Sequence, residues 1–329
     1  MIARGISAPG KAFLCGEYAV LSGAPAIVAA VDRRVNAEWT ELPPRTEQLP
    51  IEARATFEAA QERFGQPPYH LSFDTGRLYE GSNKLGLGSS AAVAVASAAA
   101  LIALREHDLK EPEVRDRVFA AALRGHSAVA PRGSGADVAA ATYGGYLWFQ
   151  RQRGELLVEP VDPPSSLVSV LLWTGKSART SDLLDRVSRL KTQSPKVHRQ
   201  CVTELHQRAT EFAQAFRSGD ARRIIMIARE YNACMGALGL AAQAPIVNDK
   251  LQRIAECAWW HGGAAKPCGA GGGDLAVAFF VDQDAASSFA AACESDGIAR
   301  VHVEWGAEGV RALQESKKPI HGTCLRRES

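Results

Sequence analysis

The stretch Asn83-Lys-Leu-Gly-Leu-Gly-Ser-Ser-Ala-Ala92 joins a glycine-containing turn to a run of alanine, valine and leucine that continues to about Leu104. The run predicts a buried helix whose first N–H groups have no partners within the helix and whose dipole places positive charge at the same end. Glycine and other small residues let an anion approach this backbone closely. Ser89 and Ser90 add hydroxyls that can bond an oxygen or help to hold a metal ion. The sequence therefore predicts a phosphate-binding loop.

Residues 86–91 also fit the loose dinucleotide-binding pattern G-x-G-x-x-G/A, and Glu106 lies near the expected acidic position. That pattern requires a strand directly before the first glycine. Residues 75–83 are instead polar and turn-rich, which argues against such a strand. The chain has no G-x-x-x-x-G-K-[ST] motif. A glycine-rich loop that precedes a buried helix and binds nothing remains the alternative.

The composition is that of an ordinary globular protein. With 329 residues, 46% of them hydrophobic and 22% charged, the chain can form two domains with substantial cores. A net charge of +2 gives no reason to expect nucleic acid as a partner. The basic residues between 176 and 208 alternate with acidic ones, a pattern typical of solvated helix faces.

The cysteines and the N-terminal residues indicate a cytoplasmic protein. Seven scattered cysteines without a C-x-x-C pair or a Cys/His ligand spacing argue against disulfides and against a zinc site. Residues 1–10 lack the apolar core of a signal peptide. The alanine-rich run after Ser90 is bounded by a loop and by Arg105-Glu-His-Asp108, so we interpret it as a buried helix and expect no membrane partner.

Hydrophobic patterns predict an α+β protein with a cleft between two halves. In the first half we expect strands at 27–31, 35–39 and 145–149, helices at 89–104 and 111–125, and an exposed turn at 151–155. In the second half we expect strands at 167–173, 275–281 and 301–305, and mainly helices up to about residue 262. The last of these helices has an apolar face formed by Val247, Leu251, Ile254 and Ala258. The proline-rich stretch 160–166 marks a boundary between domains 1–165 and 166–329.

Lys11 is the first of three further candidate groups. It follows Pro9-Gly10, so we expect it on a fixed turn, where its ammonium would stabilise charge on a transferring phosphate. Glu17 and Tyr18 could hold hydroxyls of a substrate or orient Lys11. A surface lysine followed by a strand is the alternative.

Asp137 is the second candidate group. It lies after two glycines and before small apolar residues, in Gly133-Ser-Gly-Ala-Asp-Val-Ala-Ala140. A carboxylate in such surroundings is either a helix cap or a functional acid. If it faces Lys11 across a cleft, it can position or deprotonate a substrate hydroxyl.

The third candidate group is the loop Lys266-Pro-Cys-Gly-Ala-Gly-Gly-Gly-Asp274, which precedes the strand expected at 275–281. Four of the five residues 269–273 are glycine. So many glycines cost backbone entropy, which is expected where the backbone passes close to a ligand or to another segment. A plain turn, the alternative, needs only one or two.

Taken in order, Pro9-Gly-Lys11, Gly86-Leu-Gly-Ser-Ser-Ala-Ala92 and Gly269-Ala-Gly-Gly-Gly273 resemble the three signature motifs of the GHMP kinases, which phosphorylate small molecules. The resemblance spans residues 6–281. It implies an N-terminal domain like ribosomal protein S5 domain 2, a ferredoxin-like C-terminal domain and an active site between them. It also implies that the middle motif wraps the ATP phosphates, with Lys84, Gly86, Leu87, Gly88, Ser89, Ser90 and Ala91 as the cofactor-binding residues.

Within this family the chain is most similar to the phosphomevalonate kinases, through residues 9–21, 126–141, 173–182 and Asp274. This resemblance implies phosphate transfer from ATP to (R)-5-phosphomevalonate, giving 5-diphosphomevalonate, with Mg²⁺ as a second cofactor, in a monomer or homodimer. Lys11 and Asp137 are then the catalytic candidates, and Ser90 is the candidate metal ligand. The substrate-binding candidates are Glu17, Tyr18, Ser134, Lys176, Arg179, Gly271 and Gly272.

His126 separates the chain from the mevalonate kinases, which carry a glutamate at this position to help hold magnesium. Neutral imidazole is a poor ligand for Mg²⁺. We therefore expect nucleotide phosphates, water and Ser90 to hold the metal, and His126 to be a buried structural residue. Two alternatives remain open, namely a mevalonate kinase or another GHMP small-molecule kinase, and a non-catalytic ligand sensor. The sensor is the more remote, because such proteins often lose motif residues.

Overall fold

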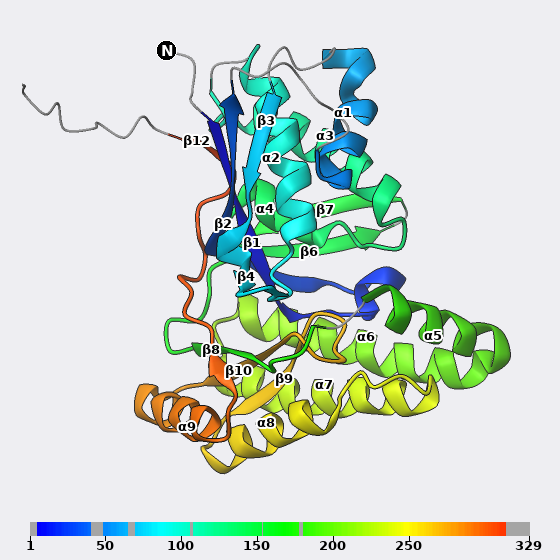
Figure 1. Cartoon of the computed structure of the whole chain (residues 1–329). Helices are drawn as coiled ribbons and strands as arrows, with labels where there is room; N and C mark the ends of the chain where they lie inside the picture. The colour runs from blue at the N-terminus through cyan, green and yellow to red at the C-terminus, as the bar shows by residue number, and fades with distance from the viewer. Residues whose placement is uncertain are drawn as a thin grey trace, which may run out of the picture.

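The computed structural model describes residues 5–40, 49–64, 70–105, 108–152, 154–177 and 180–313. Glu106 and Arg179 lie outside these residues. The described chain forms two large antiparallel sheets with helices packed on them, and one separate pair of short strands, so the predicted α+β class is confirmed (Figure 1). The boundary at 165/166 falls between the strands Glu155–Pro160 and Val168–Trp173, which belong to different sheets, and it stays a prediction.

The first sheet contains the longer strands of the first half and one strand from the end of the described chain. Its order is β12-β1-β2-β6-β7, with β3 paired to β2 beside this path. The strands are β1 (Gly5–Cys15), β2 (Ala26–Thr40), β3 (His70–Asp74), β6 (Tyr146–Gln152), β7 (Glu155–Pro160) and β12 (Arg311–Leu313). The strands expected at 27–31, 35–39 and 145–149 are confirmed, the first two as parts of one long strand. Most of the turn expected at 151–155 belongs to the two strands of a hairpin, because β6 continues to Gln152 and β7 begins at Glu155.

Helix α2 (Ser89–Ala103) is buried on nearly every side. It packs against β1 and β2 on one side and against α1 (Ile51–Phe64) and α3 (Pro112–Val129) on the other. A helix that is apolar all round belongs in a core, and small alanine side chains let it fit between a sheet and two helices. The helix predicted at 89–104 is confirmed within one residue. No helix among the described residues is long and apolar enough to span a membrane.

The second sheet has the order β11-β8-β10-β9, formed by β8 (Val168–Trp173), β9 (Ala264–Cys268), β10 (Leu275–Phe280) and β11 (Ala299–Arg300). Alternate residues of its central strands enter two different cores. One core is shared with α6 (Pro195–Arg217) and α7 (Ala221–Ala241), and the other with α8 (Asp249–Trp260) and α9 (Gln283–Ser295). This two-sided burial explains the continuous apolar runs of β8 and β10. The apolar face predicted for the last helix is confirmed for Leu251, Ile254 and Ala258, whereas Val247 precedes α8 and is only partly buried.

The strand expected at 301–305 is wrong, because this segment divides its hydrogen bonds between the two sheets. Val301 N–H still donates to Leu171 O of β8 at 2.8 Å. The chain then reaches β2, where Glu304 N–H donates to Asp32 Oδ1 at 2.8 Å and Asp32 N–H donates to Glu304 O at 3.2 Å. The alternating pattern therefore marks a crossing between two sheets. Figure 1 shows this segment leading from the lower sheet up to β12 beside β1.

No long strand leads into the glycine loop, as the turn-rich sequence indicated. The short 3₁₀ helix Gly76–Leu78 is followed by β4 (Tyr79–Glu80) and β5 (Asn83–Lys84), which pair with each other. The loop then enters α2 at Ser89. A Rossmann arrangement, which needs a strand of the main sheet before the first glycine, is thereby excluded.

Candidate active site

Lys11 lies within strand β1, so the expectation that it sits on a turn is wrong. The Pro9-Gly10 pair is accommodated by a shift in the register with β2, between Pro9 and Gly10. Such an irregularity suits a proline, which has no N–H to donate to the ladder. The Lys11 side chain is nearly buried, its Nζ donates to Gly86 O at 3.3 Å, and it lies 5.4 Å from the centre of the Phe13 ring. The ammonium is therefore fixed in place by the strand and by the glycine loop.

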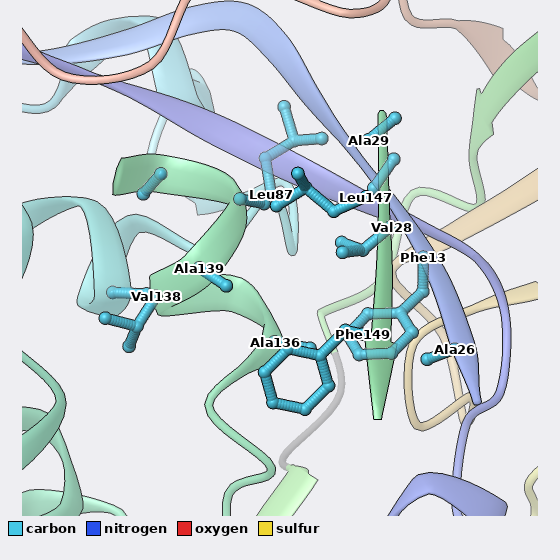
Figure 2. Packing of buried hydrophobic residues seen from close by; sticks show 14 of the residues in the cluster. Phe13, Ala26, Val28, Ala29, Leu87, Ala136, Val138, Ala139, Leu147 and Phe149 are labelled. Carbon is cyan, nitrogen blue, oxygen red and sulfur yellow. The ribbon is translucent and has the colours of Figure 1, made fainter. Parts of the chain in front are cut away.

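The glycine loop packs directly on Lys11. Lys11 N–H donates to Leu87 O at 2.8 Å, and a Cβ added at Gly88 would lie 2.9 Å from Lys11 Cγ. Gly88 has φ 78° and is the N-cap of α2, a left-handed conformation that glycine adopts without steric cost. Figure 2 shows Leu87 in one cluster with Leu147 and Phe149 of β6 and with small residues of α4 (Ala136–Tyr143). The buried leucine anchors the loop, so that the first turn of α2 faces Lys11.

Asp137 lies in the first turn of α4, where its Oδ1 accepts a hydrogen bond from Val138 N–H at 3.0 Å. The N-cap of this helix is Gly135, so Asp137 is not the capping residue. Its Oδ2 lies 3.9 Å from Nε2 of His126, a buried residue of α3, and 24% of the Asp137 side chain is exposed. The carboxylate is thus positioned by its own helix and by His126 and keeps one face toward the cleft.

The loop before β10 brings Asp274 to the glycine loop from the opposite half of the protein. Asp274 N–H donates to Lys176 O at 2.6 Å, and its carbonyl accepts from Thr174 N–H at 2.9 Å. The Asp274 side chain lies beside Gly86, the first glycine of the middle motif. Gly271 and Gly272 pack instead against Ile246, whose carbonyl accepts from Gly272 N–H at 2.9 Å. The glycines therefore permit close approach to another chain segment, which was one of the two expectations.

Two adjoining cavities connect these groups. The first, the glycine-loop cavity, has a volume of about 460 Å³ and is lined by Lys84, Gly88, Ser90 and His126, among others. The second, the Tyr18 cavity, has a volume of about 170 Å³ and is lined by Phe13, Glu17, Tyr18, Ser134 and Cys268, among others. Both are lined by Lys11, Gly86, Arg132, Gly133, Asp137, Thr180, Leu184 and Asp274. Lys11 and Asp137, the two catalytic candidates, therefore lie where the two cavities meet.

The remaining candidates differ in where their side chains lie. Leu87, Ser89 and Ala91 are buried and do not line either cavity, so they can meet a ligand only through their backbone. Lys176 is exposed and is not among the described residues that line the cavities. The structure does not bring Gly271 and Gly272 into the lining either, and Arg179 is outside the described residues.

Glu17 and Tyr18 line the second cavity but are already engaged by the second half of the protein. Glu17 Oε1 accepts a hydrogen bond from Lys266 Nζ at 2.5 Å, so this carboxylate pairs with Lys266 and not with Lys11. The Tyr18 hydroxyl donates to Ala270 O at 2.5 Å. Burial and the nearby Glu17 charge raise the pKa of Tyr18 well above its ordinary value, so this hydroxyl stays protonated.

Sequence reasoning missed three of the polar side chains that line both cavities. Arg132 lines both cavities and pairs with Asp185 of α5 (Thr180–Gln193). Its position directly before Gly133 was the available signal. Asp274 ends the glycine-rich loop and contributes to the family resemblance, but the sequence alone does not assign its side chain to the site. Thr180, at the start of α5, gave no signal, because only the packing of α5 brings it to the cleft.

A cleft between two α+β halves, with a lysine, a carboxylate and a glycine loop at the N-terminus of a helix, is the arrangement of a small-molecule kinase. Comparison with known families agrees with this class. The model for the GHMP kinases N terminal domain matches residues 52–145, and the model for the GHMP kinases C terminal domain matches residues 212–299. The chain belongs to the GHMP kinases, and with this family it shares ATP-dependent phosphotransfer.

Two individual relatives and one solved structure show which members of the family the chain resembles. The chain is 28% identical over 369 residues to the phosphomevalonate kinase of Streptomyces sp. strain CL190, covering 93% of this chain and 95% of that protein. It is 27% identical over 320 residues to the mevalonate kinase of Aeropyrum pernix, covering 89% and 93%. The solved Streptococcus pneumoniae phosphomevalonate kinase, in complex with phosphomevalonate and AMPPNP, has a TM-score of 0.76 at 19% identity, covering 91% of this chain and 98% of that one. The last likeness concerns the fold alone.

Proposed function

We propose that the protein transfers the γ-phosphate of ATP to the phosphate of (R)-5-phosphomevalonate. A phosphate oxygen of the acceptor forms a bond to the γ-phosphorus, the bond from this phosphorus to the β,γ-bridging oxygen breaks, and ADP leaves with 5-diphosphomevalonate as the product. The observation that carries the proposal is the meeting of Lys11, Asp137 and the glycine loop where the two cavities join. The 28% identity to a phosphomevalonate kinase over nearly the whole chain supports the choice of acceptor.

The charges along the cleft suit a reaction between two anions. The second pKa of a phosphate monoester is about 6, so the acceptor oxygen is already largely ionised near neutral pH. The harder task is to bring two phosphates together, which requires fixed positive charge. Lys11 supplies such a charge at the junction, Lys84 supplies another beside the glycine loop, and Arg132 lines both cavities. Asp137 then mainly orients Lys11 and the acceptor, since a strong base is not needed.

The residues present fit a magnesium ion held chiefly by the nucleotide. Among the described residues, no three His, Cys, Asp or Glu side chains form a cluster that could hold a metal by themselves. Ser90 and Asp137 offer oxygen atoms in the lining of the glycine-loop cavity, and oxygen is what Mg²⁺ prefers. Magnesium would supply charge neutralisation on the phosphates there, with Ser90 and Asp137 as the protein groups that hold it or its waters.

A coupled assay of ADP release tests the proposal. Purified protein with ATP and Mg²⁺ is given phosphomevalonate, mevalonate or no acceptor, and ³¹P NMR identifies the product. We expect ADP release with phosphomevalonate and the paired signals of a diphosphate. Turnover of mevalonate but not of phosphomevalonate would overturn the choice of acceptor.

Mevalonate kinase is the second candidate function, because the similarity to the Aeropyrum pernix mevalonate kinase covers 89% of the chain at 27% identity. This function requires an uncharged acceptor hydroxyl, so Asp137 would have to accept a proton. Binding of ATP without phosphorylation of either acceptor would instead favour the non-catalytic sensor.

A further inference from the structure

A fully buried ion pair joins the two halves of the protein behind the Tyr18 cavity. Glu17, just after β1, has 3% of its side chain exposed, and Lys266 in β9 has none exposed. Lys266 Nζ donates to Glu17 Oε1 at 2.5 Å and to Pro267 O at 2.6 Å. A buried ion pair is often no more stable than an apolar pair of the same volume, since both charges lose their water. The role of this pair therefore lies in the chain segments that it positions, and not in added stability.

Two further hydrogen bonds tie the same segments together, and a third ties Glu17 to α7. Gly269 N–H donates to Glu17 Oε1 at 3.1 Å, and the Tyr18 hydroxyl donates to Ala270 O at 2.5 Å. The Tyr231 hydroxyl of α7 donates to Glu17 O at 2.7 Å. Tyr18 has φ 61°, a left-handed conformation that a tyrosine adopts only when its surroundings hold it there. Residues 17–18 and 269–270 thus form one wall of the cavity, closed from behind by Lys266.

The Glu17 carboxylate depends on Lys266 for most of its charge compensation. Glu17 Oε2 is buried and has no hydrogen-bond partner within the described part of the chain. The Oε1 atom has two donors, Lys266 and the backbone N–H of Gly269. Without the ammonium, the wall of the cavity would carry an almost uncompensated negative charge, which both disfavours burial and repels an anion.

We infer that Lys266 is a positioning residue for the acceptor side of the site. It neutralises Glu17 and thereby holds residues 269–270 against residues 17–18, so that an anionic acceptor meets a neutral, fixed wall. Lys266 is not among the described residues that line either cavity, so it acts through Glu17 and not by touching the acceptor. The inference rests on the proposed function in one respect, since it assigns the Tyr18 cavity to the acceptor.

Steady-state kinetics of Lys266→Met test the inference. We expect the KM for the acceptor to rise about tenfold or more, with a smaller change in kcat and with the Kd for AMPPNP within about twofold of the wild-type value. The double variant Glu17→Gln/Lys266→Met removes both charges and keeps the shapes. Its acceptor KM should therefore lie well below that of Lys266→Met, a rescue that a purely structural role of the lysine does not produce.

Arg34→Met is the matched control. Arg34 is also a buried cation, in β2, and it donates to Glu308 O at 2.7 Å and to Gly309 O at 2.7 Å, away from both cavities. This variant should lower the melting temperature and leave the acceptor KM unchanged. If Lys266→Met does not fold, Glu17→Gln alone serves, because it breaks the ion pair that holds residues 269–270 against residues 17–18 and should also raise the acceptor KM through this loss of positioning.

An unchanged acceptor KM in Lys266→Met, or an equal rise in the KM values of acceptor and ATP, overturns the inference. So does a double variant whose acceptor KM is as high as that of the single variant. These outcomes are separate from the choice of acceptor. Mevalonate and phosphomevalonate are both anions, so the series is run with whichever of them the wild-type protein phosphorylates, or by calorimetric binding if it phosphorylates neither.

Discussion

Gly86 and Asp274 lie against each other across the cleft, one in the glycine loop and the other in the loop before β10. A Cβ added at Gly86 would lie 2.8 Å from Asp274 Cβ and 2.9 Å from Asp274 Cγ. Gly86 has φ 83° and Asp274 has φ 49°, so two left-handed residues meet at this contact. The contact sets how closely the phosphate loop of the first half approaches the second half.

Gly86→Ala should therefore impair catalysis more than folding. The methyl group must displace Asp274 or the loop, and a shift of about 1 Å in a catalytic site can cost roughly 100-fold in rate. We expect kcat/KM to fall by about this factor in the coupled assay. The control is Gly154→Ala in the β6–β7 turn, where φ is 91° and no atom lies within 4 Å of the added Cβ. If both variants keep wild-type kinetics, the contact has no role in the site.

Lys11→Met should remove fixed positive charge from the junction of the two cavities. Loss of one preorganised electrostatic group typically costs about 10²–10³ in kcat. We expect a loss of that size with nucleotide binding retained, as measured by steady-state kinetics and by the Kd for AMPPNP. Methionine preserves the packing against Phe13 and Gly88, so a large fall in melting temperature would instead point to a structural role.

Asp137→Asn separates the two candidate acceptors. General acid–base catalysis contributes about 10²–10⁴ to a rate, but an ionised phosphate acceptor needs no such base. For phosphomevalonate we therefore expect kcat to fall by less than about 100-fold. The loss should be larger with an alcohol acceptor. A loss near the upper end of this range with phosphomevalonate would show that Asp137 acts as a base after all.

Arg132→Gln should weaken binding of the phosphorylated acceptor. The Arg132 side chain is about half exposed, lines both cavities and pairs with Asp185. Hydrogen bonds to a charged group are worth enough to change KM roughly tenfold. We expect a KM increase of this order for phosphomevalonate, with little change in the KM for ATP. Asp185→Asn is the companion variant, since it releases the arginine from its partner and should not raise the acceptor KM.

Ala98→Leu probes the packing of α2, in which Ala98 is fully buried. Inserting extra carbon atoms into a well-packed core costs about 1–3 kcal/mol. We expect the free energy of unfolding to fall by this amount in urea titrations. The same substitution at Ala291, an exposed residue of α9, should be nearly neutral. Equal stability of the two variants would contradict the tight placement of α2 between the sheet and two helices.

Local sequence predicted the parts of the fold that depend on local chemistry. The buried helix α2, the buried strands β8 and β10 and the apolar face of α8 were all expected, because hydrophobic periodicity reports burial directly. The same reasoning gave a wrong prediction for the segment 301–305. Its alternating pattern is real, but its partners lie in two different sheets, and no local pattern states which sheet a strand joins.

In the candidate site, too, local sequence predicts some features, whereas others depend on the tertiary structure. The chemistry of the glycine loop and of Asp137 could be predicted from their neighbours in the sequence. Lys11 was expected on a turn, because the ability of a sheet to absorb Pro-Gly by a register shift is a tertiary property. The pairing of Glu17 with Lys266, 249 positions apart in the chain, and the arrival of Asp274 beside Gly86 depend on how the two halves dock. The catalytic and binding roles themselves stay predictions.

The return of the chain from the second sheet to the first has a consequence for synthesis on the ribosome. Strand β12 pairs with β1, so the first sheet contains both the earliest and the latest described strands. Until residue 313 has been made, β1 presents an open edge, which is a site for unwanted pairing with other chains. The half that is translated first is therefore completed last, and the nascent protein must protect that edge while some 150 residues of the second half emerge.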